Sequence, residues 1–197
     1  MHFRKKAGRS SRPAPLFRRA LLKRRLRPAY LAVCLLLGAH TVAFGAAENY
    51  QSPDDFLKTA FNGKIPKPEI IWLRDPLRSD IKKILGHPYA AIRIRFWKQD
   101  RRSAWILEEI GKYKPITAGI VVSDGQIEQV KILVYRESHG WEVRYPFFTN
   151  QFRDIRLSAD GGLSRGIDGI SGATLSVNAL TRLATLALRL HKHIVDR

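Results

Sequence analysis

Residues 91–135 constrain the fold most, because their polarity alternates as it does in the strands of a half-buried sheet. Apolar residues alternate with arginines at the start of this run, and a period of two is typical of a strand with one covered face. The run contains four predicted strands, at 91–98, 103–110, 115–123 and 126–135. Asp124 and Gly125 separate the last two strands, and this dipeptide favours a tight β-hairpin turn. We therefore expect an antiparallel sheet of about four or more strands, which needs other elements to cover it.

Helices are predicted before and after this run in the sequence. Residues 53–61 follow Ser52, a favourable N-cap, and residues 77–85 carry Leu and Ile at helical spacing and end before Gly86. The longest helical pattern is at 176–191, where Leu and Ala form one apolar stripe. Helices of this kind can cover the faces of the sheet, so the sequence predicts an α+β fold.

The N-terminus has the pattern of an export signal. Eleven Lys and Arg residues and no acidic residue precede Glu48, and an apolar run at 29–44 ends in small residues at 45–47. A basic segment, a short apolar run and small residues are typical of a secretory signal. The run is shorter than the roughly 20 residues that a spanning helix needs, but an uncleaved anchor stays open as an alternative. Arg18 and Arg19 leave both the twin-arginine route and the general secretory route open. We expect the domain to be exported, to the periplasm or to the outer face of the cytoplasmic membrane.

Charge and cysteine usage narrow the function classes. The formal net charge is +18, but after the basic N-terminus there remain 24 basic and 17 acidic residues, a net charge of +7. These charges are interspersed, which disfavours a nucleic-acid-binding surface. The only cysteine, Cys34, lies in the apolar run. A mature domain without it would have no disulfide, thiolate metal site or iron–sulfur cluster.

The stretch 168–176, with the sequence Asp-Gly-Ile-Ser-Gly-Ala-Thr-Leu-Ser, immediately precedes the longest helical pattern. A helix N-terminus has unpaired N–H groups and partial positive charge, so it can stabilise a phosphate group. Gly172 and Ala173 would let a bulky ligand approach the backbone, and Thr174 offers a hydroxyl that can accept a phosphoryl group. The simpler alternative is an ordinary N-cap, in which the side chain of Thr174 or Ser171 accepts from the first N–H groups.

This stretch resembles the flavinylation motif of the FMN-binding domain family, which includes subunits of sodium-pumping and Rnf electron-transport complexes. The resemblance extends over about 115–190. It implies that a transferase moves FMN from FAD onto Thr174 and leaves a phosphoester bond, so that the C-terminal helix starts at the flavinylation turn. It also implies that the motif residues around Thr174 recognise the transferase or contact the phosphate. These residues are Asp168, Gly169, Ser171, Gly172, Ala173 and Ser176.

The flavin ring would need its own contacts. The family has a Glu-Thr-Pro-Gly segment where this chain has residues 137–140, so the resemblance implies that Glu137 and Ser138 contact the ring. An aromatic side chain, Trp141 or Phe148, is expected to stack on it. The alternative for this segment is a structured loop with a packed tryptophan.

Other aromatic and histidine residues are given structural roles. The three tryptophans in the strand region, Trp72, Trp97 and Trp105, are expected to be core residues. His191 and His193 are two apart on the last helix and so do not share a face. We expect a solvated tail there and no metal site.

The predicted domains are a signal or anchor at 1–47, a helical and extended segment at 48–90 that packs on the domain, and an FMN-binding domain at 91–197. The sequence shows no acid–base pair, nucleophilic triad or dinucleotide-binding glycine motif. The predicted function is electron transfer by bound FMN, with a flavin transferase and a membrane or periplasmic redox protein as partners. Two alternatives stay open. One is a flavin-dependent reductase of a small acceptor outside the cytoplasm, and the other is a flavin-free periplasmic interaction domain.

Overall fold

The computed structural model of the chain describes residues 47–196. The predictions for the basic segment, the signal and Cys34 lie outside these residues. In the described part, the elements follow one another as β1 (Glu48–Asn49), α2 (Pro53–Ala60), β2 (Pro68–Trp72), α3 (Leu77–Leu85), β3 (Arg93–Gln99), β4 (Arg102–Ile110), β5 (Pro115–Ser123), β6 (Gln126–Tyr135), the 3-10 helix η1 (Trp141–Arg144), α4 (Pro146–Thr149), the 3-10 helix η2 (Asn150–Phe152) and α5 (Thr174–Val195).

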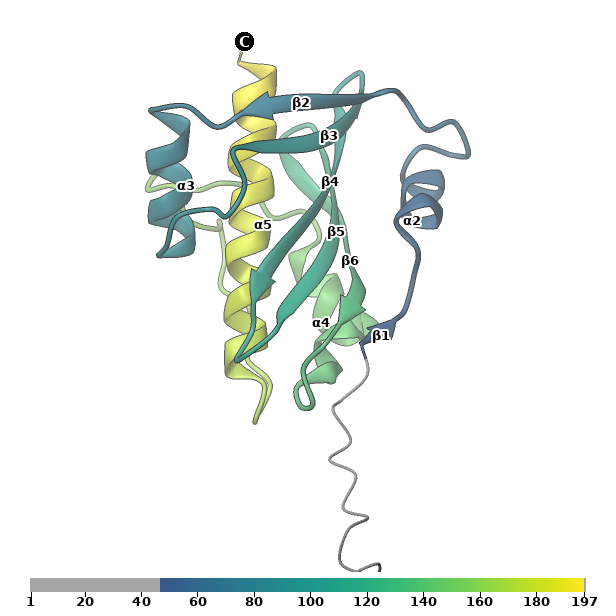
Figure 1. The fold of residues 1–197 in the computed structure, drawn as a ribbon, viewed down its shortest axis with the longest axis vertical. Coiled ribbons are helices and arrows are strands. Elements are labelled where there is room, and N and C mark those ends of the chain that lie inside the picture. The colour runs from purple at the N-terminus through teal and green to yellow at the C-terminus, as the bar shows by residue number, and fades with distance from the viewer. Residues whose placement is uncertain (1–46, 197) are drawn as a thin grey trace, which may run out of the picture. The chain divides into compact units, whose positions relative to one another are not determined.

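The strands form one antiparallel sheet of six strands in the order β1-β6-β5-β4-β3-β2. The predicted four-strand meander forms its centre, and β2 and β1 extend it at opposite edges (Figure 1). Asp124 and Gly125 both have positive φ, 52° and 75°, as the predicted tight turn between β5 and β6 requires. The sheet confirms the predicted α+β class.

Helices cover the two faces of the sheet (Figure 1). α5 lies along one face beside α3, and its apolar side packs on a buried layer that includes Trp105 and Phe96, whose rings are stacked at 5.1 Å. α2 lies on the opposite face, where Phe56 and its neighbours form a smaller core with residues of β4, β5 and β6. None of the helices in residues 47–196 is both long enough and apolar enough to cross a membrane.

Local signals place the shorter helices as predicted. Ser52 accepts a hydrogen bond from the backbone N–H of Asp55 at 3.1 Å and so caps α2. α3 ends at Gly86, which has the left-handed conformation that favours glycine. The α5 helix is longer than the predicted 176–191, because it begins at Thr174 and continues to Val195.

Two expectations about single residues are wrong. Trp72 is 51% exposed, since β2 is an edge strand and Trp72 lies on the face turned away from the core residue Ile71. His191 is buried, because it lies on the side of α5 that packs against β4, where its Nδ1 is hydrogen bonded to the Ser103 hydroxyl at 2.7 Å. Burial lowers the pKa of His191. Trp105 is fully buried, as predicted, and Trp97 is partly buried.

Candidate functional site

The N-terminus of α5 is open. Gly172 has φ of +79° and Ala173 occupies the N-cap position, and no side chain accepts a hydrogen bond from the first turn. The simpler alternative, an ordinary N-cap by Thr174 or Ser171, is therefore wrong. Because the first N–H groups of a helix lack intrahelical acceptors and carry partial positive charge, this end can receive an anion. Thr174, the first helical residue, is exposed, and its hydroxyl makes no hydrogen bond within residues 47–196.

The loop after β6 packs directly against this helix start. The Tyr135 hydroxyl is hydrogen bonded to the Ser176 hydroxyl at 2.9 Å and donates to the backbone carbonyl of His139 at 2.6 Å. Gly140 lies so close that a Cβ built on it would be 3.0 Å from the Tyr135 hydroxyl and 3.1 Å from that of Ser176. Glycine is required here by its φ of +83° and by this close approach. The loop and the first turn of α5 therefore form one packed unit.

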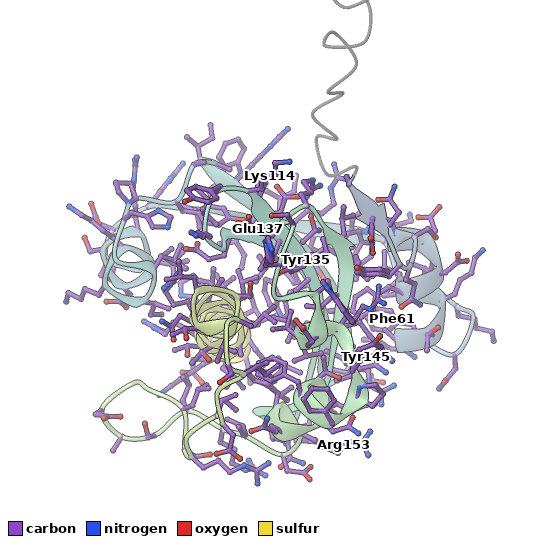
Figure 2. The ribbon with its side chains drawn as sticks, turned by 90° about the horizontal axis from the view of Figure 1, so that it is seen from below. Phe61, Lys114, Tyr135, Glu137, Tyr145 and Arg153 are labelled. Atoms are coloured by element: carbon purple, nitrogen blue, oxygen red, sulfur yellow. The ribbon has the colours of Figure 1, made fainter. Side chains whose placement is uncertain are left out.

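Glu137 holds the tip of the β4–β5 hairpin at the site. Its Oε1 atom accepts hydrogen bonds from the backbone N–H groups of Lys112, Tyr113 and Lys114, at 2.6, 2.6 and 2.8 Å. Partial burial acts to raise the pKa of Glu137, but the three N–H donors outweigh it and hold the pKa below its ordinary value. The ionised carboxylate thus holds the β4–β5 hairpin tip beside the loop after β6. In Figure 2, which looks along α5 from its N-terminal end, Glu137 lies between Lys114 and Tyr135.

These three elements enclose a pocket of about 430 Å³, within the range of about 300–1,000 Å³ that is usual for ligand sites. Residues of the hairpin tip, of the loop after β6 and of the α5 N-terminus line it. They are Lys112, Tyr113, Glu137, Ser138, His139, Gly172, Ala173, Thr174, Leu175 and Ser176. The pocket therefore offers open helix N–H groups and an exposed hydroxyl, which suits a phosphate ester at one end of a ligand.

Six of the predicted site residues meet at this pocket: Glu137, Ser138, Gly172, Ala173, Thr174 and Ser176. Ser176 is buried and its hydroxyl is engaged by Tyr135, so its side chain positions the turn. Asp168, Gly169 and Ser171 are exposed and do not line the pocket. The backbone N–H of Asp168 donates to the Gln151 side chain at 2.8 Å. This hydrogen bond attaches the segment that precedes the turn to η2.

The predicted stacking residues lie elsewhere. Trp141 does not line the pocket; it is 41% exposed and packs against Arg144 and the edge of Tyr145. Phe148 is fully buried and contacts Phe152 edge-on at 5.5 Å, so it cannot stack on a ligand at the surface. Sequence reasoning missed Lys112 and Tyr113. The antiparallel order of the strands was the available signal, because it places the β4–β5 turn at the same end of the sheet as the end of β6.

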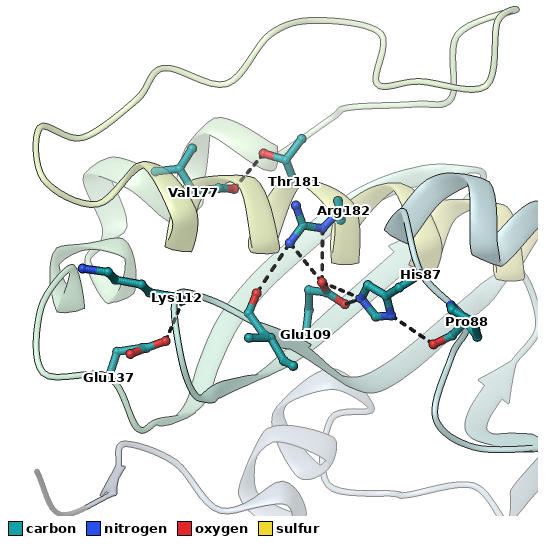
Figure 3. Close-up of polar contacts among 9 residues, drawn as sticks. His87, Pro88, Glu109, Lys112, Glu137, Val177, Thr181 and Arg182 are labelled. Carbon is teal, nitrogen blue, oxygen red and sulfur yellow. Dashed lines mark hydrogen bonds and ion pairs between the residues drawn. The ribbon is translucent and has the colours of Figure 1, made fainter. Parts of the chain in front are cut away.

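A hollow of about 610 Å³ lies outside this site and is lined by residues 87–91 and by parts of β4 and β5. Beside it, the buried Glu109 carboxylate accepts from Arg182 at 2.9 Å and from His87 at 3.0 Å (Figure 3). The bond to Glu109 raises the pKa of His87. This cluster joins β4, α5 and the loop after α3, and its carboxylate is already paired with the Arg182 guanidinium. It presents no open helix terminus, so the smaller pocket at Thr174 fits a phosphate-bearing ligand better.

The comparison with known families agrees with this assignment. Residues 111–189 match the FMN-binding domain, and the match spans the hairpin tip, the loop after β6 and the start of α5. Residues 111–189 therefore form an FMN-binding domain, and FMN is the cofactor of this domain.

Among solved structures, the fold is similar to that of NqrC from Shewanella oneidensis, with a TM-score of 0.55 and 14% identity over 73% of this chain and 96% of that chain. A subunit of the Na(+)-translocating NADH-quinone reductase from Parabacteroides distasonis also matches, with a TM-score of 0.41 and 19% identity over 66% of this chain and 81% of that chain. A search of curated proteins finds no match.

Proposed function

We propose that this chain is an exported electron-transfer flavoprotein whose FMN is attached through a phosphoester bond to Thr174. One observation carries the proposal. Within the region that matches the FMN-binding domain, Thr174 presents an exposed, unbonded hydroxyl at the uncapped start of a long helix, inside a pocket. The same hydroxyl position is the one that the family motif assigns to flavin attachment.

The residues of the pocket would have different roles in binding the cofactor. The open N–H groups at the start of α5 would hold the phosphate, because they donate hydrogen bonds and lie at the positive end of the helix dipole. Gly172 and Ala173 leave the backbone accessible, and a Cβ built on Gly172 meets no atom within 4 Å. Tyr135 keeps this turn in place through Ser176.

Attachment needs the Thr174 oxygen to replace the AMP portion of FAD on the FMN phosphorus, with release of AMP and loss of the hydroxyl proton. A flavin transferase is the partner for this step. The exposure of Thr174 supports it, since the hydroxyl is accessible to a second protein.

We propose that the bound FMN serves in electron transfer. FMN supplies the redox chemistry when bound, while the protein supplies position and electrostatics. A membrane or periplasmic redox protein is the proposed partner, and the likeness in fold to NqrC supports this choice. The N-terminal signal pattern supports export to the periplasm or to the outer face of the cytoplasmic membrane.

Intact-protein mass spectrometry after coexpression with a flavin transferase tests the proposal. We expect one FMN mass on the parent chain and on Thr181→Val, a control that removes a hydroxyl of the same helix outside the pocket. We expect no added mass on Thr174→Val, which has nearly the same shape but no hydroxyl. An FMN mass that persists in Thr174→Val, or its absence from the parent chain, would show that Thr174 is not the attachment site.

A further inference from the structure

The tip of the β4–β5 hairpin carries an aromatic ring that the fold does not use. Tyr113 is 75% exposed, more than any other large apolar or aromatic residue of the described chain. Its ring packs on no core cluster, and it contacts the Lys112 ammonium group, which lies 4.9 Å from the ring centroid. An exposed aromatic ring at the rim of a pocket is a common ligand contact.

The backbone that carries this ring is held in place. One Glu137 oxygen receives the N–H groups of three consecutive residues, including Tyr113 itself. Gly111 fits closely beside this carboxylate, since a Cβ there would be 3.1 Å from Glu137 Oε1 and 3.1 Å from Ile116 Cδ1. These three hydrogen bonds fix the backbone of the hairpin tip, so that Tyr113 is presented at a defined place.

That place is the wall of the pocket that also contains Thr174. A ligand attached by its phosphate at the start of α5 must extend toward the hairpin tip or away from the protein. We propose that Tyr113 stacks on the isoalloxazine ring and that Glu137 is the positioning residue that sets the hairpin tip for this contact. The proposal rests on the proposed function, because it requires FMN at Thr174.

Tyr113 replaces Trp141 as the expected stacking residue. Arg144 lies 5.1 Å from the Trp141 ring, and Tyr145 meets the same ring edge-on at 5.6 Å. The Trp141 ring thus packs against Arg144 and Tyr145 and lies outside the pocket. It provides a matched control, because it is an exposed aromatic residue near the site with a different predicted role.

Flavin fluorescence tests the contact, since an electron-rich ring stacked on isoalloxazine quenches its emission. Holoprotein of the parent chain, Tyr113→Leu, Tyr113→Trp and Trp141→Leu is compared at equal flavin content, which intact mass establishes. We expect weak emission from the parent, Tyr113→Trp and Trp141→Leu, and severalfold stronger emission from Tyr113→Leu. Unchanged emission in Tyr113→Leu, or stronger emission in Trp141→Leu alone, would overturn the proposal. Glu137→Gln should raise emission partly without loss of the FMN mass, and unchanged emission there would refute its positioning role.

A second measurement uses the parent chain alone and does not depend on how the variants load. Tyrosine nitration by tetranitromethane, mapped by peptide mass, is compared in the chain with and without attached flavin. Tyr113 should react in the flavin-free chain and be protected in the holoprotein, while Tyr145 reacts equally in both. Equal nitration of Tyr113 would refute stacking even when the FMN mass is present. A parent chain without the FMN mass would instead refute the proposed function, and stacking with it.

Discussion

Gly140→Ala tests the claim that the loop after β6 and the start of α5 form one packed unit. Gly140 has φ of +83°, and an added Cβ would lie 3.0 Å from the Tyr135 hydroxyl, 3.1 Å from the Ser176 hydroxyl and 3.2 Å from the Ala173 Cβ. The two hydroxyls are hydrogen bonded to each other at 2.9 Å. A methyl group at this position therefore has to displace a buried hydrogen bond as well as strain the backbone.

The cost has two parts. A left-handed conformation of a non-glycine residue costs about 1 kcal/mol, and weakening a buried hydrogen bond costs about 1–2 kcal/mol more. Together they lower the free energy of unfolding by about 2–3 kcal/mol. For a domain of this size, such a change lowers Tm by about 4–12 °C.

Urea and thermal unfolding of the flavin-free domain measure this cost. The matched control is Gly161→Ala, because Gly161 has φ of +87° and no atom within 4 Å of an added Cβ, so that only the backbone cost of about 1 kcal/mol applies. If the two variants lose equal stability, the close packing around Gly140 contributes nothing and the reasoning is wrong. Flavin loading should also fall in Gly140→Ala and not in the control, since only Gly140 touches the turn that carries Thr174.

Two other predictions concern charged groups away from the pocket. Glu109→Gln should lower the free energy of unfolding by about 2 kcal/mol, because a side chain that is 2% exposed loses its charge while the Arg182 guanidinium keeps its own. A change below about 0.5 kcal/mol in urea unfolding, as at an ordinary surface site, would contradict this. The second concerns His191, whose pKa is lowered by burial in the folded state. As pH falls through the ordinary histidine pKa of about 6.5, His191 becomes protonated in the unfolded chain but stays neutral in the folded chain. The free energy of unfolding therefore decreases. His191→Gln should therefore lose less stability than the parent chain between about pH 8 and about pH 5.5. Equal losses of stability in the two chains would contradict this role of His191. The pKa of His87 is raised and contributes in the opposite direction, but this contribution is present in both chains and cancels in their difference.

Much of the fold could be predicted because its signals are local. The alternation of apolar residues, the Asp124-Gly125 turn and the caps at Ser52 and Gly86 each act over a few residues, and each produces the expected element. The short strand β1 was not predicted, because two residues are too few to show a period.

The candidate site could be predicted in part. Thr174 stands out in the sequence because a hydroxyl follows Gly172 and Ala173 at the start of a helical pattern. The sequence did not indicate Tyr113, because its place in the pocket depends on a hairpin tip that Glu137 holds from 23 to 25 residues away. Stacking by Phe148 was mispredicted for a related reason, since only packing decides whether an aromatic ring fills the core or faces a ligand.

The sequence by itself determined the longer helices, the four central strands, the α+β class and the resemblance that singles out Thr174. These follow from local periodicity, turn chemistry and a short motif. The tertiary structure decided which neighbours Thr174 has, because strand order and the course of the loop after β6 set them. It decided that the start of α5 has no side-chain cap and that Trp72 is exposed while His191 is buried. Hydrogen bonds and burial between distant residues depend on packing, which no stretch of the sequence shows alone.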